Sequence, residues 1–127
     1  MTALSIGLPV YNGERYLAAA LDALLDQTYR DFELIIADNA SIDRTSEICR
    51  AFAAGDDRVR YFRNEANLGA ARNYNLTLER AGGRYFKWAA HDDLCHPRFL
   101  ERCTAVLDTE PDTVLVHSRS LAIDEHG

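Results

Sequence analysis

Residues 32–37 read Phe-Glu-Leu-Ile-Ile-Ala, and Asp38-Asn39-Ala40-Ser41 follows them directly. A run that is nearly all apolar is typical of a strand covered on both faces, as in the sheets of parallel α/β proteins. The polar residues after it have the composition of a loop, and Ser41 or Asp43 can cap a helix that runs to Gly55. This part of the chain therefore predicts a strand, a loop and a helix in that order.

The same alternation extends on both sides of this unit. Apolar runs predict strands at residues 4–10, 32–37, 59–62, 85–90 and 114–117. Apolar residues at helical spacing predict helices that begin near Tyr16, Ser41, Gly69 and Pro97. Strands that alternate with helices favour an α/β domain with right-handed crossovers. We therefore predict a three-layer α/β/α sandwich with a mostly parallel, Rossmann-like sheet.

Length and composition indicate one globular domain that covers residues 1–127. Apolar residues make up 47% of the chain, enough for a real core. The net charge of −6 argues against nucleic acid as a partner, since binding its phosphates needs a dense cationic face. No run approaches the roughly 20 apolar residues of a membrane span, and the first residues do not resemble a signal peptide.

Three cysteines without close spacing predict neither a disulfide framework nor a zinc site. We therefore expect a cytoplasmic protein. A peripheral location at the inner face of the membrane would depend on segments outside this chain.

Polar side chains gather where the predicted strands end. The residues in question are Pro9, Tyr11 and Asn12 after the first strand, Asp38 and Asn39 after the second, and His91, Asp92 and Asp93 after the fourth. The carboxyl ends of parallel strands share one edge, and ligands bind there where the strand order reverses. Taken alone, Asp38 is equally compatible with a helix cap or a turn.

Asp92 and Asp93 are adjacent carboxylates, and a divalent cation would relieve their mutual repulsion. Magnesium and manganese prefer oxygen ligands and often take one or two carboxylates together with phosphate oxygens. The pair also suits the start of the helix predicted from Pro97, where negative charge complements the helix dipole. Both interpretations fit the sequence. For His91 and His96, hydrogen bonding or packing is favoured over zinc binding.

Several common enzyme classes lack their signatures here. The chain has no Gly-x-Gly-x-x-Gly after the first strand, no Walker loop and no Gly-x-Ser-x-Gly turn. A response-regulator receiver would need acidic residues near the end of the first strand, where this chain has Pro9-Val10-Tyr11-Asn12.

Five segments are weak signals alone and specific in combination. They are residues 5–12, 25–29, 31–45, 67–73 and 91–93, and they include Asp38-Asn39-Ala40-Ser41, Asn67-Leu68-Gly69 and His91-Asp92-Asp93. In this order they resemble the family 2 glycosyltransferases of the GT-A fold. The third segment contains a loop similar to one commonly written Asp-Asp-Gly-Ser in that family, and the last segment lies where the family has its Asp-x-Asp motif. Asn39 and His91 stand at positions where the family usually has aspartate.

The resemblance implies a nucleotide-sugar site and a metal site. Nucleotide-sugar binding would involve Pro9, Tyr11, Asn12, Asp38, Arg72 and Asp92, and metal binding would involve Asp93 and Asp92. Asp38 would accept a hydrogen bond from the base edge, and Arg72 would lie near the base or the phosphates. Asp93 would ligate Mn²⁺ or Mg²⁺ that bridges the diphosphate of the donor.

The function implied is transfer of a sugar, with inversion, from a nucleoside diphosphate sugar to a saccharide or lipid-linked acceptor. We expect this chain to be the donor-binding part of a longer glycosyltransferase, with the catalytic base outside it. A non-catalytic module that binds a nucleotide or nucleotide sugar is the alternative. A nucleotidyltransferase is a third possibility, but its usual Gly-rich basic loop is absent from the sequence.

Overall fold

The computed structural model describes residues 2–127 and places four strands and four helices within them. In chain order these are β1 (Leu4–Val10), α1 (Leu17–Leu25), β2 (Phe32–Asp38), α2 (Thr45–Gly55), β3 (Val59–Arg63), α3 (Ala70–Glu79), β4 (Tyr85–Trp88) and α4 (Phe99–Thr109). The strict alternation of strand and helix confirms the predicted α/β class. Within this part of the chain, no helix is both long and apolar enough to cross a membrane.

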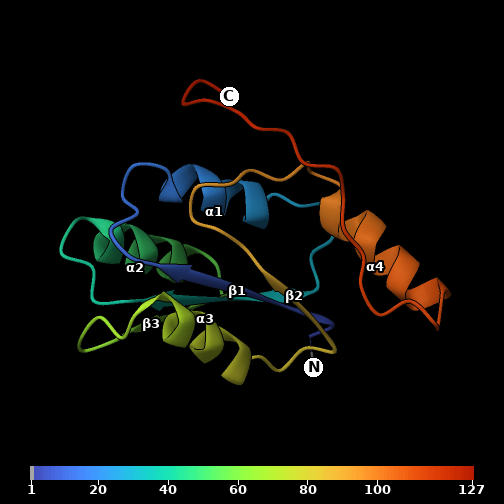
Figure 1. The fold of residues 1–127 in the computed structure, drawn as a ribbon, viewed down its shortest axis with the longest axis horizontal. Helices are drawn as coiled ribbons and strands as arrows, with labels where there is room; N and C mark the ends of the chain where they lie inside the picture. The colour runs from blue at the N-terminus through green and yellow to red at the C-terminus, as the bar shows by residue number, and fades with distance from the viewer. Residues whose placement is uncertain (1) are drawn as a thin grey trace.

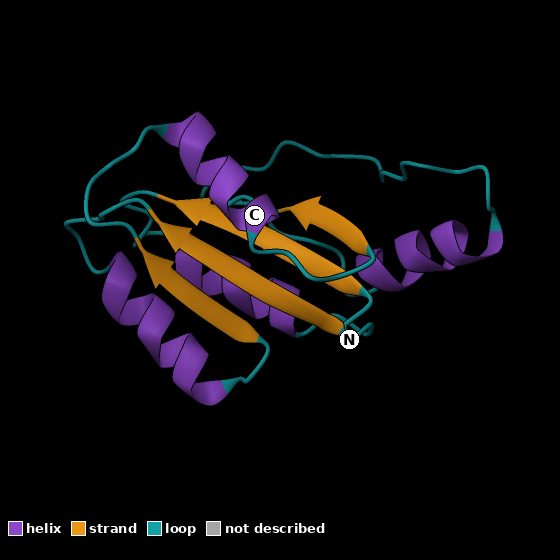
Figure 2. Cartoon of the chain, turned by 90° about the horizontal axis from the view of Figure 1, so that it is seen from below, coloured by secondary structure: helices purple, strands orange, loops and turns teal. Residues whose placement is uncertain are grey.

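The four strands form one sheet in the order β3-β2-β1-β4, and every neighbouring pair is parallel. All arrowheads therefore point to the same edge of the sheet (Figure 2). From β1 the chain adds β2 and β3 on one side and then returns, through α3, to place β4 on the other side of β1. The strand order consequently reverses between β1 and β4.

Helices cover both faces of the sheet. Helices α1 and α2 lie on one face and α3 on the other, while α4 lies beside the sheet (Figure 1). The predicted three-layer arrangement is therefore confirmed. Strands β1 and β2 lie between these layers, which explains why their sequences are almost continuously apolar.

Glycine at position 7 allows α3 to approach the sheet closely. A Cβ atom built there would overlap the Thr77 side chain of α3 and would lie 2.8 Å from Cζ of Phe86 on β4. The glycine thus lets β1, α3 and β4 meet directly beneath the edge where the strands end.

Gln27 fixes α4 against the end of α1. Its side chain is only 1% exposed. Nε2 donates to the carbonyl of His96 at 2.8 Å, and Oε1 accepts from the Leu100 N–H at 3.0 Å. A buried amide whose donor and acceptor are both used gives α4 one defined position.

The prediction of a strand at residues 114–117 is wrong. These residues form no ladder, and Val114 and Leu115 are 94% and 77% exposed. The chain after α4 runs along the outside of the molecule (Figure 1). An apolar run becomes a strand only where a neighbouring strand offers its backbone groups, and this segment has no such neighbour within residues 2–127. Strand β4 also ends at Trp88, two residues earlier than predicted.

Candidate functional site

A pocket of ≈ 260 Å³ opens at the carboxyl edge of the sheet, where the strand order reverses between β1 and β4. We call it the switch pocket. It is lined by Pro9, Val10, Tyr11, Asn39, Asn67, Ala70, Asn73, Tyr74 and His91. Four of these residues, Pro9, Tyr11, Asn39 and His91, belong to the set expected where the predicted strands end. Such a position is the usual ligand site of an open α/β sheet.

Asn12 joins the loops that follow β1 and β2 instead of lining the switch pocket. Its N–H donates to Oγ of Ser41, and its Oδ1 accepts from the N–H of Ile42, both at 2.9 Å. Its φ of 49° is left-handed, a conformation that asparagine tolerates better than most residues. The two hydrogen bonds hold these loops side by side. Asn12 therefore has a structural role at the site.

Ala40 has a φ of 63° in the loop after β2. A non-glycine residue with left-handed backbone carries a cost of about 1–2 kcal/mol. This is the position at which the similar loop of family 2 glycosyltransferases is written with glycine. The left-handed backbone at this position explains why the family's loop has glycine there. In this chain Ala40 adopts the same conformation.

Asp38 lies beneath the pocket and is 0% exposed. Its Oδ1 accepts from the Ser41 N–H at 2.9 Å, and its Oδ2 accepts from the Tyr61 hydroxyl at 2.7 Å. Burial, together with the bond to Asp38, raises the pKa of Tyr61 to about 12, so its hydroxyl keeps the proton that it donates. Asp38 thus shapes the loop from below, and the contact with a base edge stays a prediction.

Four asparagines form the floor beside the pocket. Asn39 Nδ2 donates to Oδ1 of Asn67 at 2.9 Å, and Asn64 Nδ2 donates to both Asn39 and Asn73. Asn73 Nδ2 in turn donates to the carbonyl of Ala37 at 2.8 Å. This network ties the end of β2 to the start of α3 and explains the polar residues at 67–73 as structural supports of the site.

His91 packs directly on the β1–α1 loop. A Cβ atom at Gly13 would lie 2.8 Å from Nδ1 of His91 and 2.7 Å from Cγ2 of Val10. The same Nδ1 is buried and has no hydrogen-bond partner in the described part of the chain. A buried polar atom without a partner in a pocket wall is a place where a ligand or water completes the bonding.

We expect Gly13→Ala to lower the free energy of unfolding by about 1–3 kcal/mol, because the added methyl group overpacks the contact with His91. A double-mutant cycle with His91→Ala should give a coupling of about 0.5–3 kcal/mol, measured by urea unfolding. Additive effects of the two substitutions would show that contact with the His91 ring is not the reason for glycine at position 13.

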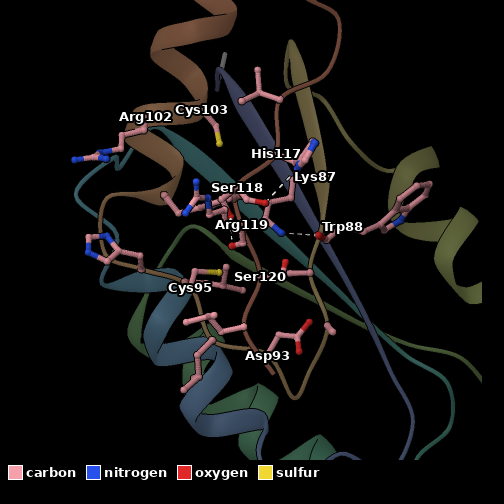
Figure 3. A pocket seen from close by; sticks show the side chains of 18 of the residues that line it. Lys87, Trp88, Asp93, Cys95, Arg102, Cys103, His117, Ser118, Arg119 and Ser120 are labelled. Atoms are coloured by element: carbon pink, nitrogen blue, oxygen red, sulfur yellow. Dashed lines mark hydrogen bonds between the residues drawn. The ribbon is translucent and has the colours of Figure 1, made fainter. Parts of the chain in front are cut away.

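Asp92 and Asp93 follow His91 in an exposed turn, and neither carboxylate forms an ion pair within residues 2–127. Asp93 does not face the switch pocket but lines a second, larger cavity (Figure 3). We call this the outer cavity; it lies between β4, α4 and residues 116–127. The described residues bring no third histidine, cysteine or carboxylate to this pair.

Arg72 lies on the exposed side of α3. Its Nη1 is 2.7 Å from Oε1 of Glu79, and both side chains are about half exposed. It lines neither the switch pocket nor the outer cavity. A role near a base or phosphate would require the pair with Glu79 to open.

The structure thus gathers only part of the predicted set. Pro9 and Tyr11 line the switch pocket, while Asn12, Asp38, Arg72 and Asp92 do not. Sequence reasoning missed Tyr74 and assigned no ligand role to Asn39, Asn73 or His91. The signal that could have found them is position: Asn39 follows β2 directly, and His91 follows the strand predicted at residues 85–90.

Solved structures of glycosyltransferases share this fold. TarS of S. aureus superposes with a TM-score of 0.78 at 26% identity, covering 84% of this chain and 32% of TarS, and one of its structures is a complex with UDP-GlcNAc. The mannosyltransferase PcManGT of Pyrobaculum calidifontis, in complex with GDP-Man and Mn²⁺, gives a TM-score of 0.77 at 22% identity, over 86% of this chain and 33% of that protein. The fold is therefore that of the GT-A enzymes.

Curated relatives match at the level of sequence. EpsE of Bacillus subtilis is 36% identical over 125 residues, which is 98% of this chain and 45% of the relative. The glycosyltransferase GlyG of Streptococcus pneumoniae is 36% identical over 98 residues, 77% of this chain and 33% of the relative. The chain spans less than half the length of either. The family model of glycosyl transferase family 2 matches residues 5–126, and the chain therefore belongs to that family.

Proposed function

We propose that this chain binds a nucleoside diphosphate sugar and serves as the donor-binding part of a glycosyltransferase. The observation that carries the proposal is the switch pocket, which lies where the strand order reverses and is lined by Pro9, Tyr11 and His91. Membership of family 2 and the likeness to TarS, which has been solved with UDP-GlcNAc, support it.

The nucleoside fits the switch pocket better than the diphosphate does. Within this pocket no lysine, arginine or carboxylate lines the wall, whereas Tyr11 and Tyr74 offer aromatic surfaces for a base. Asn39 supports this wall from below, because its amide is buried and bonded to Asn67, Asn64 and the Leu68 N–H.

The diphosphate is assigned to the turn at Asp92 and Asp93, which lies between the switch pocket and the outer cavity. Two exposed carboxylates without ion pairs fit Mg²⁺ or Mn²⁺, which commonly take one or two carboxylates and complete their shell with substrate phosphates and water. When bound, such an ion would offset the negative charge of the diphosphate as it leaves. The complex of PcManGT with Mn²⁺ supports this assignment.

The reaction proposed is displacement at the anomeric carbon with inversion. The acceptor hydroxyl loses its proton to a base and forms a new C–O bond, while the bond between the anomeric carbon and the diphosphate breaks. The nucleoside diphosphate leaves with the electron pair. No residue of this chain is assigned as the base, so the steps proposed for it are binding and orientation of the donor.

Asp93→Asn should abolish the gain in UDP affinity that Mn²⁺ confers. Loss of a group that supports a bound metal typically costs about 10–100-fold in metal affinity, and loss of a direct ligand should cost at least as much. The measurement is calorimetric titration with UDP, and in parallel with GDP, in the presence of Mn²⁺ or of a chelator.

Asp57→Asn is the matched control, because Asp57 is exposed and lies before β3, at the opposite edge of the sheet. It should leave the effect of Mn²⁺ unchanged. Equal UDP affinity with Mn²⁺ and with chelator in the unmodified chain would rule out the metal assignment.

A further inference from the structure

The outer cavity is far larger than the switch pocket, at ≈ 980 Å³, and nothing in the donor assignment uses most of it. Its walls come from β4, the turn after it, α4 and the segment after α4. Asp93, which belongs to the turn proposed to hold the diphosphate, lines this cavity (Figure 3). The cavity is therefore adjacent to the place where the anomeric carbon of a bound donor would lie.

The charge of this cavity is opposite to that of the chain. The whole sequence has 20 acidic residues against 14 basic ones. Among the charged side chains that line the outer cavity, however, Lys87, Arg102 and Arg119 are cationic and only Asp93 is anionic. A cationic cavity in an acidic protein favours an anionic ligand.

The cations of the cavity form no ion pair with a carboxylate in the described part of the chain. Within residues 2–127, seven arginines form ion pairs with carboxylates and three others lie over aromatic rings. Arg102 and Arg119 do neither, and Lys87 forms no ion pair. In Figure 3, Arg102 points away from the centre of the cavity, which leaves Lys87 and Arg119 as its inner cations.

Lys87 is held in place by its surroundings. It is the only lysine of the chain and is partly buried on β4. Its Nζ donates to the carbonyl of Trp88 at 2.8 Å and lies 5.3 Å from the centre of the Phe99 ring. One of the three ammonium hydrogens is thus used, and the other two can donate to a ligand.

The thiol of Cys103 does not neutralise Lys87. Burial raises the pKa of Cys103, while the charge of Lys87 acts in the opposite direction. This thiol is therefore protonated near neutral pH. The positive charge of Lys87 remains available to a ligand.

We propose that the outer cavity binds the phosphate group of the acceptor, through Lys87 and Arg119, and so selects acceptors that carry a phosphate. The inference rests on the proposed donor site, because that site places the reacting carbon beside the cavity. Serine hydroxyls at 118 and 120 and apolar walls formed by Phe99 and Val106 complete the lining. These groups suit a phosphate on an alcohol or lipid better than a free ion, which would use the charges alone.

The test is isothermal titration calorimetry with glycerol 3-phosphate as the probe. Titrations contain a chelator, so that no metal at Asp93 holds the phosphate. The unmodified chain should bind saturably, and Lys87→Met and Arg119→Gln should each weaken binding about tenfold or more. Lys87→Arg should retain binding, and Arg30→Gln, which changes an arginine outside the cavity, should have no effect. Glycerol is the uncharged control.

Vesicles of phosphatidylcholine with and without phosphatidic acid separate the two sources of phosphate. Sedimentation with acidic vesicles that Lys87→Met abolishes would identify a lipid headgroup, and binding of the soluble probe alone would identify a soluble acceptor. Affinity that is the same in Lys87→Met and in the unmodified chain, for both probes, overturns the proposal.

Titration with UDP and Mn²⁺ distinguishes failure of the phosphate-site proposal from failure of the donor-site proposal. Lys87→Met should bind UDP as the unmodified chain does. If it loses UDP but keeps glycerol 3-phosphate, Lys87 serves the donor and the acceptor proposal is wrong. If the unmodified chain binds the probe through Lys87 but does not bind UDP, the proposed donor function fails and the phosphate site stands.

Discussion

Asp38→Ala is expected to lower the free energy of unfolding by about 3–6 kcal/mol, because each of two hydrogen bonds to a charged group contributes about 1.5–3 kcal/mol. The carboxylate is fully buried, and its removal would leave the Ser41 N–H and the Tyr61 hydroxyl without their partner. The loss is a large share of the roughly 5–15 kcal/mol by which domains are stable. Urea unfolding followed by circular dichroism measures it.

Tyr61→Phe removes one of these two bonds and should cost about half as much. A loss below about 1 kcal/mol in Asp38→Ala would mean that solvent reaches the carboxylate, contrary to its burial in the structure.

Asp38→Asn separates the structural role of this residue from the predicted contact with a base. The amide keeps the shape and can still accept from Ser41 and donate to the Tyr61 oxygen. Since Asp38 does not line the switch pocket, we expect unchanged affinity for uridine. A loss of about 1–3 kcal/mol in uridine binding, without loss of stability, would instead establish the base contact that the resemblance implies.

The strands could be predicted from sequence where both faces of the sheet are covered. Residues 4–10 and 32–38 are almost completely buried, so most of their positions are apolar and the signal is strong. Residues 114–117 are also mostly apolar, but they form no strand, and Val114 and Leu115 remain exposed. Apolar sequence marks a segment that can be buried, whereas pairing depends on a neighbouring strand that composition does not reveal.

The sequence predicted that the site lies at the carboxyl edge of the sheet. It did not predict which side chains point into the site. The end of a strand places Pro9, Tyr11 and His91 near the carboxyl edge whatever their rotamers. The direction of Asn12 depends on a left-handed loop residue, and that of Arg72 on the rotation of α3 about its axis. The helix crosses β1 and β2 and brings Tyr74 to the pocket, a contact between distant segments that no local pattern reports.

The isolated chain is expected to bind a nucleotide sugar and yet to transfer sugar extremely slowly. Donor contacts are assigned to residues at the ends of β1, β2 and β4, all of which are present. No residue among 2–127 is assigned as the base that takes the proton of the acceptor hydroxyl, and general-base catalysis is typically worth about 10²–10⁴-fold. Incomplete positioning of the acceptor would lower the rate further. Binding and turnover should therefore separate in this chain.

The assay supplies radiolabelled UDP-GlcNAc and GDP-mannose, Mn²⁺ and acceptors with and without a phosphate group, and it scores both transfer and hydrolysis. Slow hydrolysis is compatible with the expectation, because water can attack the anomeric carbon without a positioned base. Rapid transfer would contradict it and would place the base within these residues. His91 and His117 would then be the first to replace, because His91 lines the switch pocket and His117 the outer cavity, on either side of the proposed diphosphate turn. Loss of transfer in one of these variants, with UDP affinity retained, would identify the base.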